Sequence, residues 1–382
     1  MTAIYLDHNA TTPLDPEVRA EMTACLEGVF GNPSSLHAAG QEARRVVEKA
    51  RARVARLISA QPEEIVFTGG GTEANNLALF GAVTAAKRDH PHVLTTAIEH
   101  QSVLNPCRRL EQTGSSVTYL GVDREGLLDP ERAVAAVRNK TVVVSIMLAN
   151  NDVGTVQPVT ELSAETRERR ILLHTDAVQA VGKLPVDVKA LGVDLLSFSG
   201  HKLYGPKGVG ALFVRKGIRL SPLVFGGHQE RGLRPGTENV AAIAGFGKAC
   251  EIAAARLVED AARLAGLRSS FETAILEQVR GVTINGRGAP RLPNTSNISF
   301  EGLEGEMLTI NLDLLGVAVS TGAACRSADH EPSSVLLAMR RSPEEALSSI
   351  RVSFGRGNTP EEVVRAVALI GQAVAAMREG RR

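Results

Sequence analysis

The stretch Ile65-Val66-Phe67-Thr68-Gly69-Gly70-Gly71-Thr72-Glu73 determines how this 382-residue chain folds. Apolar residues of strand length precede a run of glycines, and a helical pattern begins near Thr72. Glycines let the backbone approach a ligand closely, and the free amides at the start of a helix attract anions. The stretch therefore predicts a phosphate-binding turn in which Gly71 and Thr72 contact the ligand. A tight turn with Thr72 as a capping residue is the simpler alternative.

The same turn fits a second kind of site. Gly69, Gly71 and Ala74 match a loose dinucleotide-binding fingerprint, and Asp89 follows at a plausible distance. A nicotinamide-dependent enzyme is therefore an open alternative. The match is weak support, because the turn does not open the first strand–helix–strand unit and because other loops offer chemistry that a nicotinamide site does not need.

On both sides of this turn, apolar runs of strand length alternate with helical patterns. The runs are Ile65–Thr68, Val93–Ile98, Val142–Ala149, Ile171–His174, Asp194–Ser199 and Ala211–Val214. Such alternation predicts an α/β fold with a mostly parallel, buried sheet flanked by helices. Later strands at Thr295–Phe300 and Ile350–Phe354, with a helix from Pro360 to Met377, predict a separate and smaller α+β domain.

Chains longer than roughly 250–300 residues usually divide into domains. We expect an N-terminal arm at residues 1–15, a large domain at residues 16–255 and a small domain at residues 256–382. The arm is extended and broken by prolines, which is typical of a segment that packs back onto the molecule, here onto the small domain. A long helix from about Val240 to Val279 is expected to link the two domains.

The composition excludes several classes of protein. The chain has 43 basic and 42 acidic residues, no Trp and three Tyr, so we expect no direct nucleic-acid substrate and no membrane-surface binding. The start lacks the pattern of a secretion signal and no apolar run is long enough to span a membrane, so a cytoplasmic protein is expected. The four cysteines lack the spacing of disulfide frameworks or zinc sites, so no metal site is predicted.

A second chemical motif, Ser197-Phe198-Ser199-Gly200-His201-Lys202, ends one of the apolar strands. Burial beside small residues and a histidine lowers the pKa of a lysine, which makes its amine nucleophilic enough to form a Schiff base. We therefore predict that Lys202 holds a carbonyl cofactor and that Ser199 and His201 donate hydrogen bonds to its phosphate. A solvated lysine in a polar loop is the alternative.

A third motif, His174-Thr175-Asp176-Ala177-Val178-Gln179, follows another strand. Ligands of α/β sheets bind at the carboxyl ends of the strands, and a pyridine-ring cofactor needs a carboxylate on its ring nitrogen. Asp176 fits that role and Gln179 is placed to contact the ring hydroxyl, although Asp176 is also a plausible helix N-cap. The phosphate turn, Lys202 and Asp176 together predict pyridoxal 5'-phosphate as the cofactor.

These motifs and several others resemble the cysteine desulfurases of the fold-type I, class V aminotransferase superfamily. The matching segments are Tyr5–Pro13, Phe30–Ser35, Glu99–His100, Ala149–Gly154, Ser199–Lys202, Glu230–Asn239 and Ser320–Cys325. The resemblance implies a sheet of the seven-stranded type and a homodimer. It also implies conversion of L-cysteine to L-alanine, with the sulfur carried on Cys325 as a persulfide. An acceptor protein, either an iron–sulfur scaffold or a thiolation enzyme, then takes the sulfur.

The resemblance also implies roles for individual residues. His100 lies over the cofactor ring and transfers protons, and Asn151 contacts cofactor or substrate. Asn32 lies on the substrate side, and Thr237 reaches the cofactor phosphate of the other subunit. Arg351 binds the substrate carboxylate, and a guanidinium on a strand is well suited to do so because it can form two parallel hydrogen bonds. A surface strand arginine is the alternative for Arg351.

Cys325 distinguishes the candidate reactions. It lies in a small, polar stretch typical of a mobile loop, and Arg326 beside it favours the thiolate. The loop length resembles the group with a long catalytic loop. Cys25, Cys107 and Cys250 lie in or near helical patterns and are expected to be structural.

The chain departs from the family pattern in a few places. The cysteine loop reads Ser-Thr-Gly-Ala-Ala-Cys where relatives commonly have Ser-Ser-Gly-Ser-Ala-Cys, and Ser102 stands where Ala is frequent. A selenocysteine lyase or a class V aminotransferase shares Lys202 and Asp176, but only a desulfurase requires Cys325. A sulfur-relay scaffold without turnover is the alternative from a different class of protein.

Overall fold

The computed structural model describes residues 3–321 and 331–380 of the chain. The strands in these ranges are β1 (Ile4–Tyr5), β2 (Ile65–Thr68), β3 (His92–Thr96), β4 (Ser116–Leu120), β5 (Thr141–Ser145), β6 (Leu172–Asp176), β7 (Leu195–Ser199), β8 (Gly210–Val214), β9 (Val282–Asn285), β10 (Thr295–Phe300), β11 (Val317–Ala318) and β12 (Ser349–Ser353). The α-helices are α1 (Pro16–Gly28), α2 (Ala38–Leu57), α3 (Gly71–Ala86), α4 (Gln101–Gln112), α5 (Pro130–Ala135), α6 (Val159–Glu168), α7 (Val188–Leu191), α8 (Val240–Gln278), α9 (Gly305–Leu314), α10 (Ser334–Ala338), α11 (Pro343–Leu347) and α12 (Pro360–Glu379). Short 3-10 helices are η1 (Pro62–Glu64), η2 (Gly200–Lys202) and η3 (Gln229–Gly232).

The larger part of the chain is built on a sheet of seven strands among the described residues, in the order β2-β8-β7-β6-β5-β3-β4. Only β8 runs against its neighbours, and the other strands of this sheet are parallel to one another. The predicted α/β class with a mostly parallel sheet is therefore confirmed. The carboxyl ends of the parallel strands meet at one edge, where ligands of such sheets bind.

The two faces of this sheet are covered by different helices because side chains alternate along each strand. On β2, Ile65 and Phe67 pack into the cluster that includes residues of α2 and α8. Val66 between them faces the opposite side, toward α3. Every residue of β2 is buried, which explains why the strand reads as a continuous apolar run rather than an alternating one.

Two predicted strands of the large sheet end earlier in the structure, and β4 of this sheet was not predicted. The short strands β1, β9 and β11 were not predicted either. The predicted run Val142–Ala149 leaves the sheet after Ser145, and Val93–Ile98 leaves it after Thr96. In both cases the remaining apolar residues lie in the loop that follows the strand, and each of these two loops carries a site residue. The edge strand β4 has only half-buried residues, so it lacks the apolar run that marks a strand in the sequence.

The smaller part of the chain is built on an antiparallel sheet, β12-β10-β9, and a short parallel pair, β1 with β11. Ile4 and Leu6 of the N-terminal arm pack in the same hydrophobic cluster as these strands and α12. Helix α12 begins with Thr359 as N-cap, and the Glu362 carboxylate accepts a hydrogen bond from the Thr359 N–H in return.

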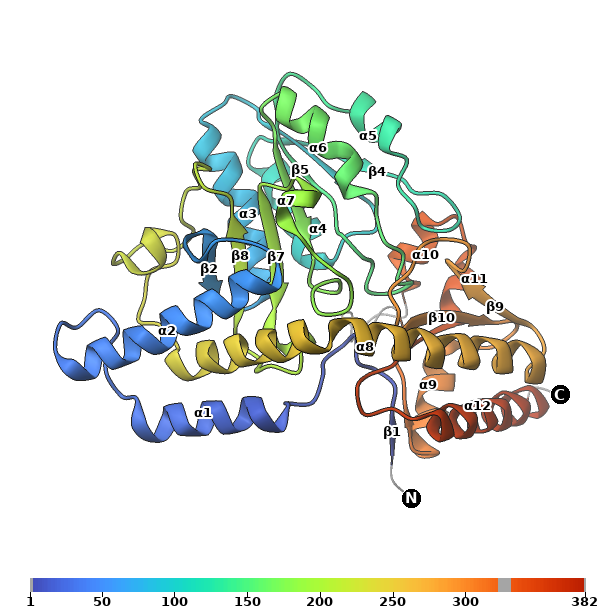
Figure 1. The fold of residues 1–382 in the computed structure, drawn as a ribbon. Coiled ribbons are helices and arrows are strands. Elements are labelled where there is room, and N and C mark those ends of the chain that lie inside the picture. Colours follow the sequence, from blue (N-terminus) through green and yellow to red (C-terminus); the bar gives the residue numbers. More distant parts are fainter. Residues whose placement is uncertain (1–2, 322–330, 381–382) are drawn as a thin grey trace.

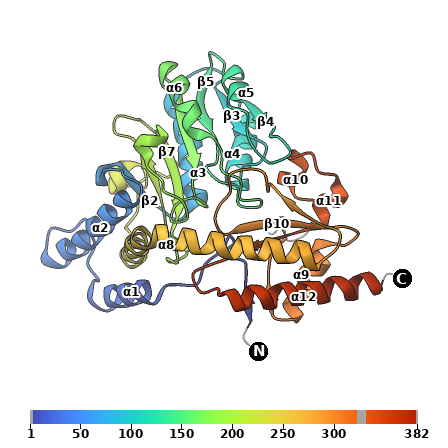
Figure 2. The ribbon, with the colours of Figure 1, turned by 45° about the vertical axis from the view of Figure 1, so that its right-hand side comes forward.

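Helix α8 connects the two parts, as Figures 1 and 2 show. Its first half contributes Phe246 and Cys250 to the core under the large sheet, and its second half contributes Phe271 and Ile275 to the core of the smaller part. The predicted boundary between residues 255 and 256 lies within this helix, so the division into domains stays a prediction. Figure 2 shows α12 running beside the second half of α8.

Within residues 3–321 and 331–380, no helix combines the length and the apolar character that crossing a bilayer requires. In the same ranges, no group of His, Cys, Asp and Glu side chains converges in a way that could hold a metal ion. Cys25, Cys107 and Cys250 are buried free thiols, and burial raises the pKa of Cys107 to about 12. These thiols are therefore poor nucleophiles, as their apolar surroundings in the sequence predict.

Candidate active site

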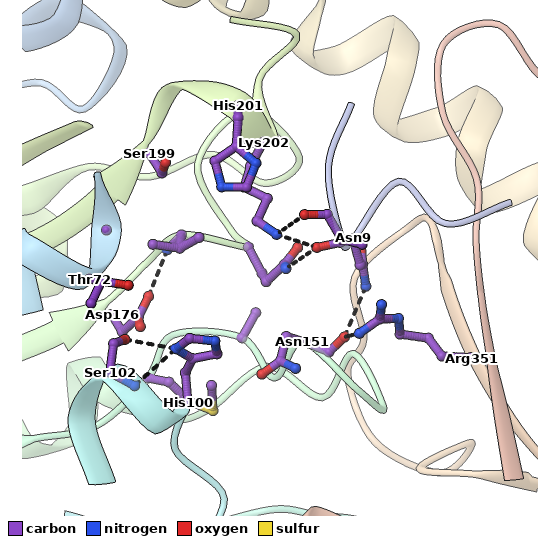
Figure 3. Close-up of a pocket in the computed structure, with 16 residues that line it drawn as sticks. Asn9, Thr72, His100, Ser102, Asn151, Asp176, Ser199, His201, Lys202 and Arg351 are labelled. Atoms are coloured by element: carbon purple, nitrogen blue, oxygen red, sulfur yellow. Dashed lines mark hydrogen bonds between the residues drawn. The ribbon is translucent and has the colours of Figure 1, made fainter. Parts of the chain in front are cut away.

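A cavity of about 310 Å³ lies between the carboxyl edge of the large sheet, the N-terminal arm and β12. Most of the residues predicted for the site line it. They are Gly71, Thr72, His100, Asn151, Asp176, Gln179, Ser199, His201, Lys202 and Arg351. Residues from several separate loops and strands therefore meet in one place, as Figure 3 shows.

The glycine turn forms one end of the cavity. Helix α3 begins at Gly71, and its N-cap residue is Gly70, which has a φ of 149° and no side chain to cap the first amides. A Cβ atom on Gly71 would lie only 2.6 Å from Val178 Cγ2, so no larger residue fits there. Thr72 lies within the first turn and is not the cap, which removes the simpler alternative for this turn. The uncapped amides leave an anion site.

Asp176 lies at the end of β6, in the wall of the cavity. It is 5% exposed, and its Oδ1 accepts a hydrogen bond from the Val178 N–H at 3.0 Å. Its Oδ2 accepts one from Asn75 Nδ2 at 2.7 Å. Among the described residues the next α-helix along the chain begins only at Val188, so Asp176 is not a helix N-cap. These donors fix the carboxylate in a position to bind a protonated ring nitrogen.

A hydrogen-bonded chain connects Asp176 with His100. Asn75, which is fully buried, donates both to Asp176 Oδ2 and to Ser102 Oγ at 2.8 Å. The Ser102 hydroxyl lies 2.7 Å from His100 Nδ1, and the Ser102 backbone N–H donates to the same nitrogen at 3.1 Å. Because Nδ1 accepts these bonds, the proton of the neutral imidazole lies on Nε2. Asn75 was not predicted as a site residue, because nothing in the sequence distinguishes it from the other positions of a mostly apolar helix.

Glu99 immediately precedes His100 in the chain and is buried. Its Oε1 accepts hydrogen bonds from Thr96 Oγ1 at 2.6 Å and from the Met147 N–H at 2.9 Å. Burial, helped by the nearby charge of Asp176, raises the pKa of Glu99 to about 8. The carboxyl group is therefore mostly protonated at neutral pH, and it holds the loop on which Met147 lines the cavity.

Lys202 lies on η2, immediately after β7, and its side chain reaches the N-terminal arm. Its Nζ donates to the carbonyl oxygens of Asn9 at 2.5 Å and Ala10 at 2.6 Å. His201 beside it contacts Thr11 Oγ1 through Nδ1 at 3.2 Å. Burial, together with the charge of Lys202, lowers the pKa of His201 to about 4, so His201 is neutral at physiological pH. The arm is thus part of the site, and Asn9 is a contact that sequence reasoning missed.

Arg351 reaches the cavity from β12 in the smaller part of the chain. It is 4% exposed, so the alternative of a surface strand arginine is wrong. Nη1 donates to the Asn151 carbonyl at 3.1 Å and Nη2 to Asp7 Oδ1 at 2.8 Å. Its buried Nε has no hydrogen-bond partner among the described residues. The guanidinium therefore brings positive charge and donor capacity to the side of the cavity opposite Asp176 (Figure 3).

Two predicted site residues do not line this cavity, and a third is not among the described residues. Asn32 is exposed between α1 and α2, where its Oδ1 accepts a hydrogen bond from the Ser34 N–H. Thr237 is exposed in the loop before α8, and Arg234 of the same loop pairs with Glu73 of α3 at 2.9 Å. Cys325 lies outside the described residues. The roles of these three residues stay predictions.

Comparisons with known proteins agree with the geometry. The family model described as aminotransferase class-V matches residues 4–365. The chain belongs to the class V aminotransferase family. This member is 49% identical to "Cysteine desulfurase IscS" of Dictyoglomus turgidum over 94% of the chain and 91% of that protein. It is 48% identical to "Cysteine desulfurase IscS" of Neisseria meningitidis over 99% and 94%, respectively.

Solved structures show the same likeness for this class V aminotransferase. A "NIFS-like protein" superposes with a TM-score of 0.92 at 38% identity, covering 98% of this chain and all of that one. A structure described as "SspA in complex with cysteine" superposes with a TM-score of 0.83 at 36% identity, covering 92% and 98%. The large sheet, the smaller part and their arrangement are therefore shared with these relatives.

Proposed function

We propose that this class V aminotransferase is a pyridoxal-phosphate-dependent cysteine desulfurase that converts L-cysteine to L-alanine. One arrangement carries the proposal: Lys202 and Asp176 line a single cavity whose opposite side presents the Arg351 guanidinium. An amine, a ring-nitrogen carboxylate and a carboxylate-binding cation are what this chemistry on an amino acid needs. Relatives named cysteine desulfurases, at 43–49% identity over nearly the whole chain, support the choice of reaction.

The residues present fit pyridoxal 5'-phosphate. The uncapped start of α3, with no room for a side chain at Gly71, suits the phosphate, and Thr72, Ser199 and His201 lie beside it in the cavity wall. Asp176 would hold the ring nitrogen, Gln179 the ring hydroxyl and Lys202 the aldehyde carbon. When bound, the cofactor draws electrons away from Cα of the substrate, which makes the Cα proton removable.

The chain's own residues then divide the work of the reaction. Arg351 binds the substrate carboxylate, and Asn151 and Asn32 lie on the substrate side. The Lys202 amine takes the proton from Cα. His100 exchanges protons through Nε2, because its Nδ1 is held by Ser102. This division explains why His100 and Lys202 lie on different sides of the same cavity.

Cys325 completes the reaction. Its thiolate attacks the sulfur of the substrate, so that a sulfur–sulfur bond forms while the bond from sulfur to Cβ breaks and leaves its electron pair on the carbon side. Protonation of that carbon and return of the proton from Lys202 to Cα then give alanine, and the enzyme keeps the sulfur as a persulfide. A sulfur-acceptor protein of an iron–sulfur scaffold or thiolation pathway takes it up. We further propose a homodimer in which Thr237 contacts the phosphate of the other subunit, and a reducing, cytoplasmic setting that keeps Cys325 as a thiol.

The test measures the visible absorbance of the purified chain before and after addition of L-cysteine, with alanine and sulfide assayed under a reductant. We expect a yellow protein whose band shifts and which forms alanine and sulfide in equal amounts. Lys202→Ala should lower alanine formation by at least about a hundredfold, the scale of a lost proton-transfer group. A chain that stays colourless and inert with added pyridoxal phosphate contradicts the proposal.

Cys325→Ser separates the desulfurase from related reactions. We expect it to keep the absorbance band and its shift with cysteine but to lose alanine formation, because no thiolate accepts the sulfur. Cys25→Ser is the matched control, since Cys25 is buried in α1 and lies outside the cavity. If alanine formation survives intact in Cys325→Ser, a different lyase or an aminotransferase describes the chain better.

A further inference from the structure

Lys183 is a buried lysine next to the cavity, and none of the roles described so far uses it. It is 8% exposed and lies in the turns that follow β6. Its Nζ donates to Gln179 Oε1 at 2.6 Å and to Asn9 Oδ1 at 3.0 Å. Both partners are amide oxygens, not carboxylates, so no ion pair explains the burial of this amine.

The hydrogen bonds of Lys183 suit an uncharged amine. Burial lowers the pKa of Lys183 well below its ordinary value, and the positive charges of Lys202 and Arg351 lower it further. A neutral amine has two N–H groups, and the structure provides two amide oxygens to accept them. Lys183 therefore acts as a double hydrogen-bond donor between two side-chain amides.

Lys183 orients the Gln179 amide and shares the orientation of Asn9 with Asn294, whose Nδ2 also donates to Asn9 Oδ1 at 3.1 Å. Because Gln179 turns its oxygen to Lys183, its Nε2 faces the other way and donates to the Asn9 carbonyl at 2.9 Å. That carbonyl also accepts the hydrogen bond from Lys202. Asn9 likewise turns its Oδ1 to Lys183, and its Nδ2 donates to the Asn151 carbonyl at 3.2 Å and to Thr295 Oγ1 at 2.8 Å.

We propose that Lys183 is a positioning residue for the cofactor site, which holds the Gln179 amide and the Asn9 side chain in the orientations that binding requires. Through Gln179 it fixes the hydrogen-bond donor offered to the cofactor ring. Through Asn9 it fixes the segment of the arm that contacts Lys202, the large sheet and the smaller part of the chain. The inference rests on the proposed function and adds to it the residue that sets the geometry of the ring contact.

Two substitutions distinguish hydrogen bonding from packing. Lys183→Met keeps an unbranched side chain, one bond shorter than that of lysine, and removes both donors. Gln179 Oε1 then loses its hydrogen bond from Lys183, and Asn9 Oδ1 keeps only the one from Asn294 Nδ2. We expect the dissociation constant for pyridoxal phosphate to rise about tenfold. Lys183→Gln has a side chain with the same number of bonds as Lys183→Met but keeps N–H donors, so its dissociation constant should fall between those of the wild type and Lys183→Met. Packing alone predicts the reverse order.

The experiment titrates pyridoxal phosphate into the full-length chain freed of cofactor and follows the absorbance of the bound form. Lys140→Met is the control, because Lys140 is exposed and precedes β5. The thermal midpoint of each cofactor-free variant is measured in parallel. Weaker binding without a matching loss of thermal stability supports a positioning role, and weaker binding that merely follows a lower midpoint overturns it.

A double variant tests whether Lys183 acts through Gln179. In a Gln179→Leu background, Lys183→Met should raise the dissociation constant by a smaller factor than in the wild type, since one of the two amides that it orients is gone. If Lys183→Met binds pyridoxal phosphate as tightly as the wild type, or Lys183→Gln binds it more weakly than Lys183→Met, the inference is wrong. If the wild type itself binds no pyridoxal phosphate, the proposed function fails and this inference fails with it.

Discussion

The two sides of the cavity are held together in different ways. We name the first the sheet wall, which consists of Asn75, His100, Ser102 and Asp176. We name the second the arm wall, which consists of Asn9, Asn151, Lys183 and Arg351. Hydrogen bonds within the sheet wall join residues at most 101 positions apart, on β6, α3 and the start of α4. Those of the arm wall join residues 142, 174 and 200 positions apart.

This difference indicates a division of labour. The sheet wall is fixed by strand topology and by the start of α4, so it holds the groups that must not move when protons are exchanged. The arm wall forms only when the arm, the large sheet and the smaller part of the chain come together, and it offers the cation that binds a carboxylate. We therefore expect changes in the arm wall to weaken substrate binding and changes in the sheet wall to slow turnover.

The largest effect should come from Arg351. Arg351→Met removes the cation that we propose binds the substrate carboxylate, and it leaves Asp7 without its ion pair. Hydrogen bonds to charged groups contribute about 1.5–3 kcal/mol, so the KM for L-cysteine should rise about tenfold to a hundredfold while kcat falls much less. Steady-state kinetics over a wide range of cysteine concentrations measure both constants.

Arg132→Met, an exposed change on α5, serves as the control for that experiment. If Arg351→Met lowers kcat and leaves KM unchanged, the arm wall does not hold the substrate and the proposed division is wrong. A KM effect in the control as well would point to a general effect of lost positive charge.

Each wall could be predicted from the sequence only in part: Asp176 by its place on a strand, and His100, Asn151 and Arg351 with the help of the family resemblance. Asp176 ends an apolar strand and Lys202 follows one, and parallel topology brings such positions to one edge. The contact of Asn9 with Lys202, by contrast, spans 193 positions and depends on how the arm is seated against the rest of the chain. Pattern reasoning along the chain has no signal for such a contact. Arg351 was found through the family resemblance together with its place on a strand.

Lys183 is another residue whose contacts could not be predicted from the sequence pattern. Nothing in the turn between β6 and α7 distinguishes a lysine that is buried from one that is solvated, because the acceptors that bury it come from residues 9 and 179. Gln179 is only four positions away, but Asn9 is 174 positions away, and its approach cannot be predicted from the turn alone. The sequence therefore predicts the residues that carry out the chemistry better than it predicts the residues that hold them in place.

The next effect concerns the stability of the loop that leads into the sheet wall. Between pH 5 and pH 8 the unfolded chain releases the Glu99 proton, whereas the folded chain keeps it because its pKa is raised to about 8. In this pH range only the folded state binds the proton. The contribution of Glu99 to the free energy of unfolding therefore falls as the pH rises, by up to about 1.4 kcal/mol per pH unit. Glu99→Gln lacks this titration, so its free energy of unfolding relative to the wild type should increase from pH 5 to pH 8.

Urea unfolding at pH 5, 6.5 and 8 measures this difference, and Glu131→Gln on the surface of α5 is the matched control. Oε2 of Glu99 is buried without a hydrogen-bond partner among the described residues, so the amide introduced by Glu99→Gln adds a cost at every pH. The prediction therefore concerns the change with pH and not the offset. A difference between variant and wild type that stays constant across the three pH values would mean that Glu99 is ionised in the folded chain.

The smallest effect, and the finest test of the comparison, comes from Ser102. Ser102→Ala removes the hydroxyl between Asn75 and His100, but the backbone N–H at position 102 still donates to His100 Nδ1. The imidazole therefore keeps its tautomer and loses one hydrogen bond of about 1 kcal/mol, so kcat should fall about twofold to fivefold with an unchanged KM.

Exposed Ser269→Ala on α8 is the control. A hundredfold loss would show that the hydroxyl carries the proton itself, and a raised KM would show that the sheet wall also binds substrate. The nitrogen chemical shifts of His100 decide whether the tautomer has changed, because Nδ1 and Nε2 give distinct signals when only one of them carries the proton.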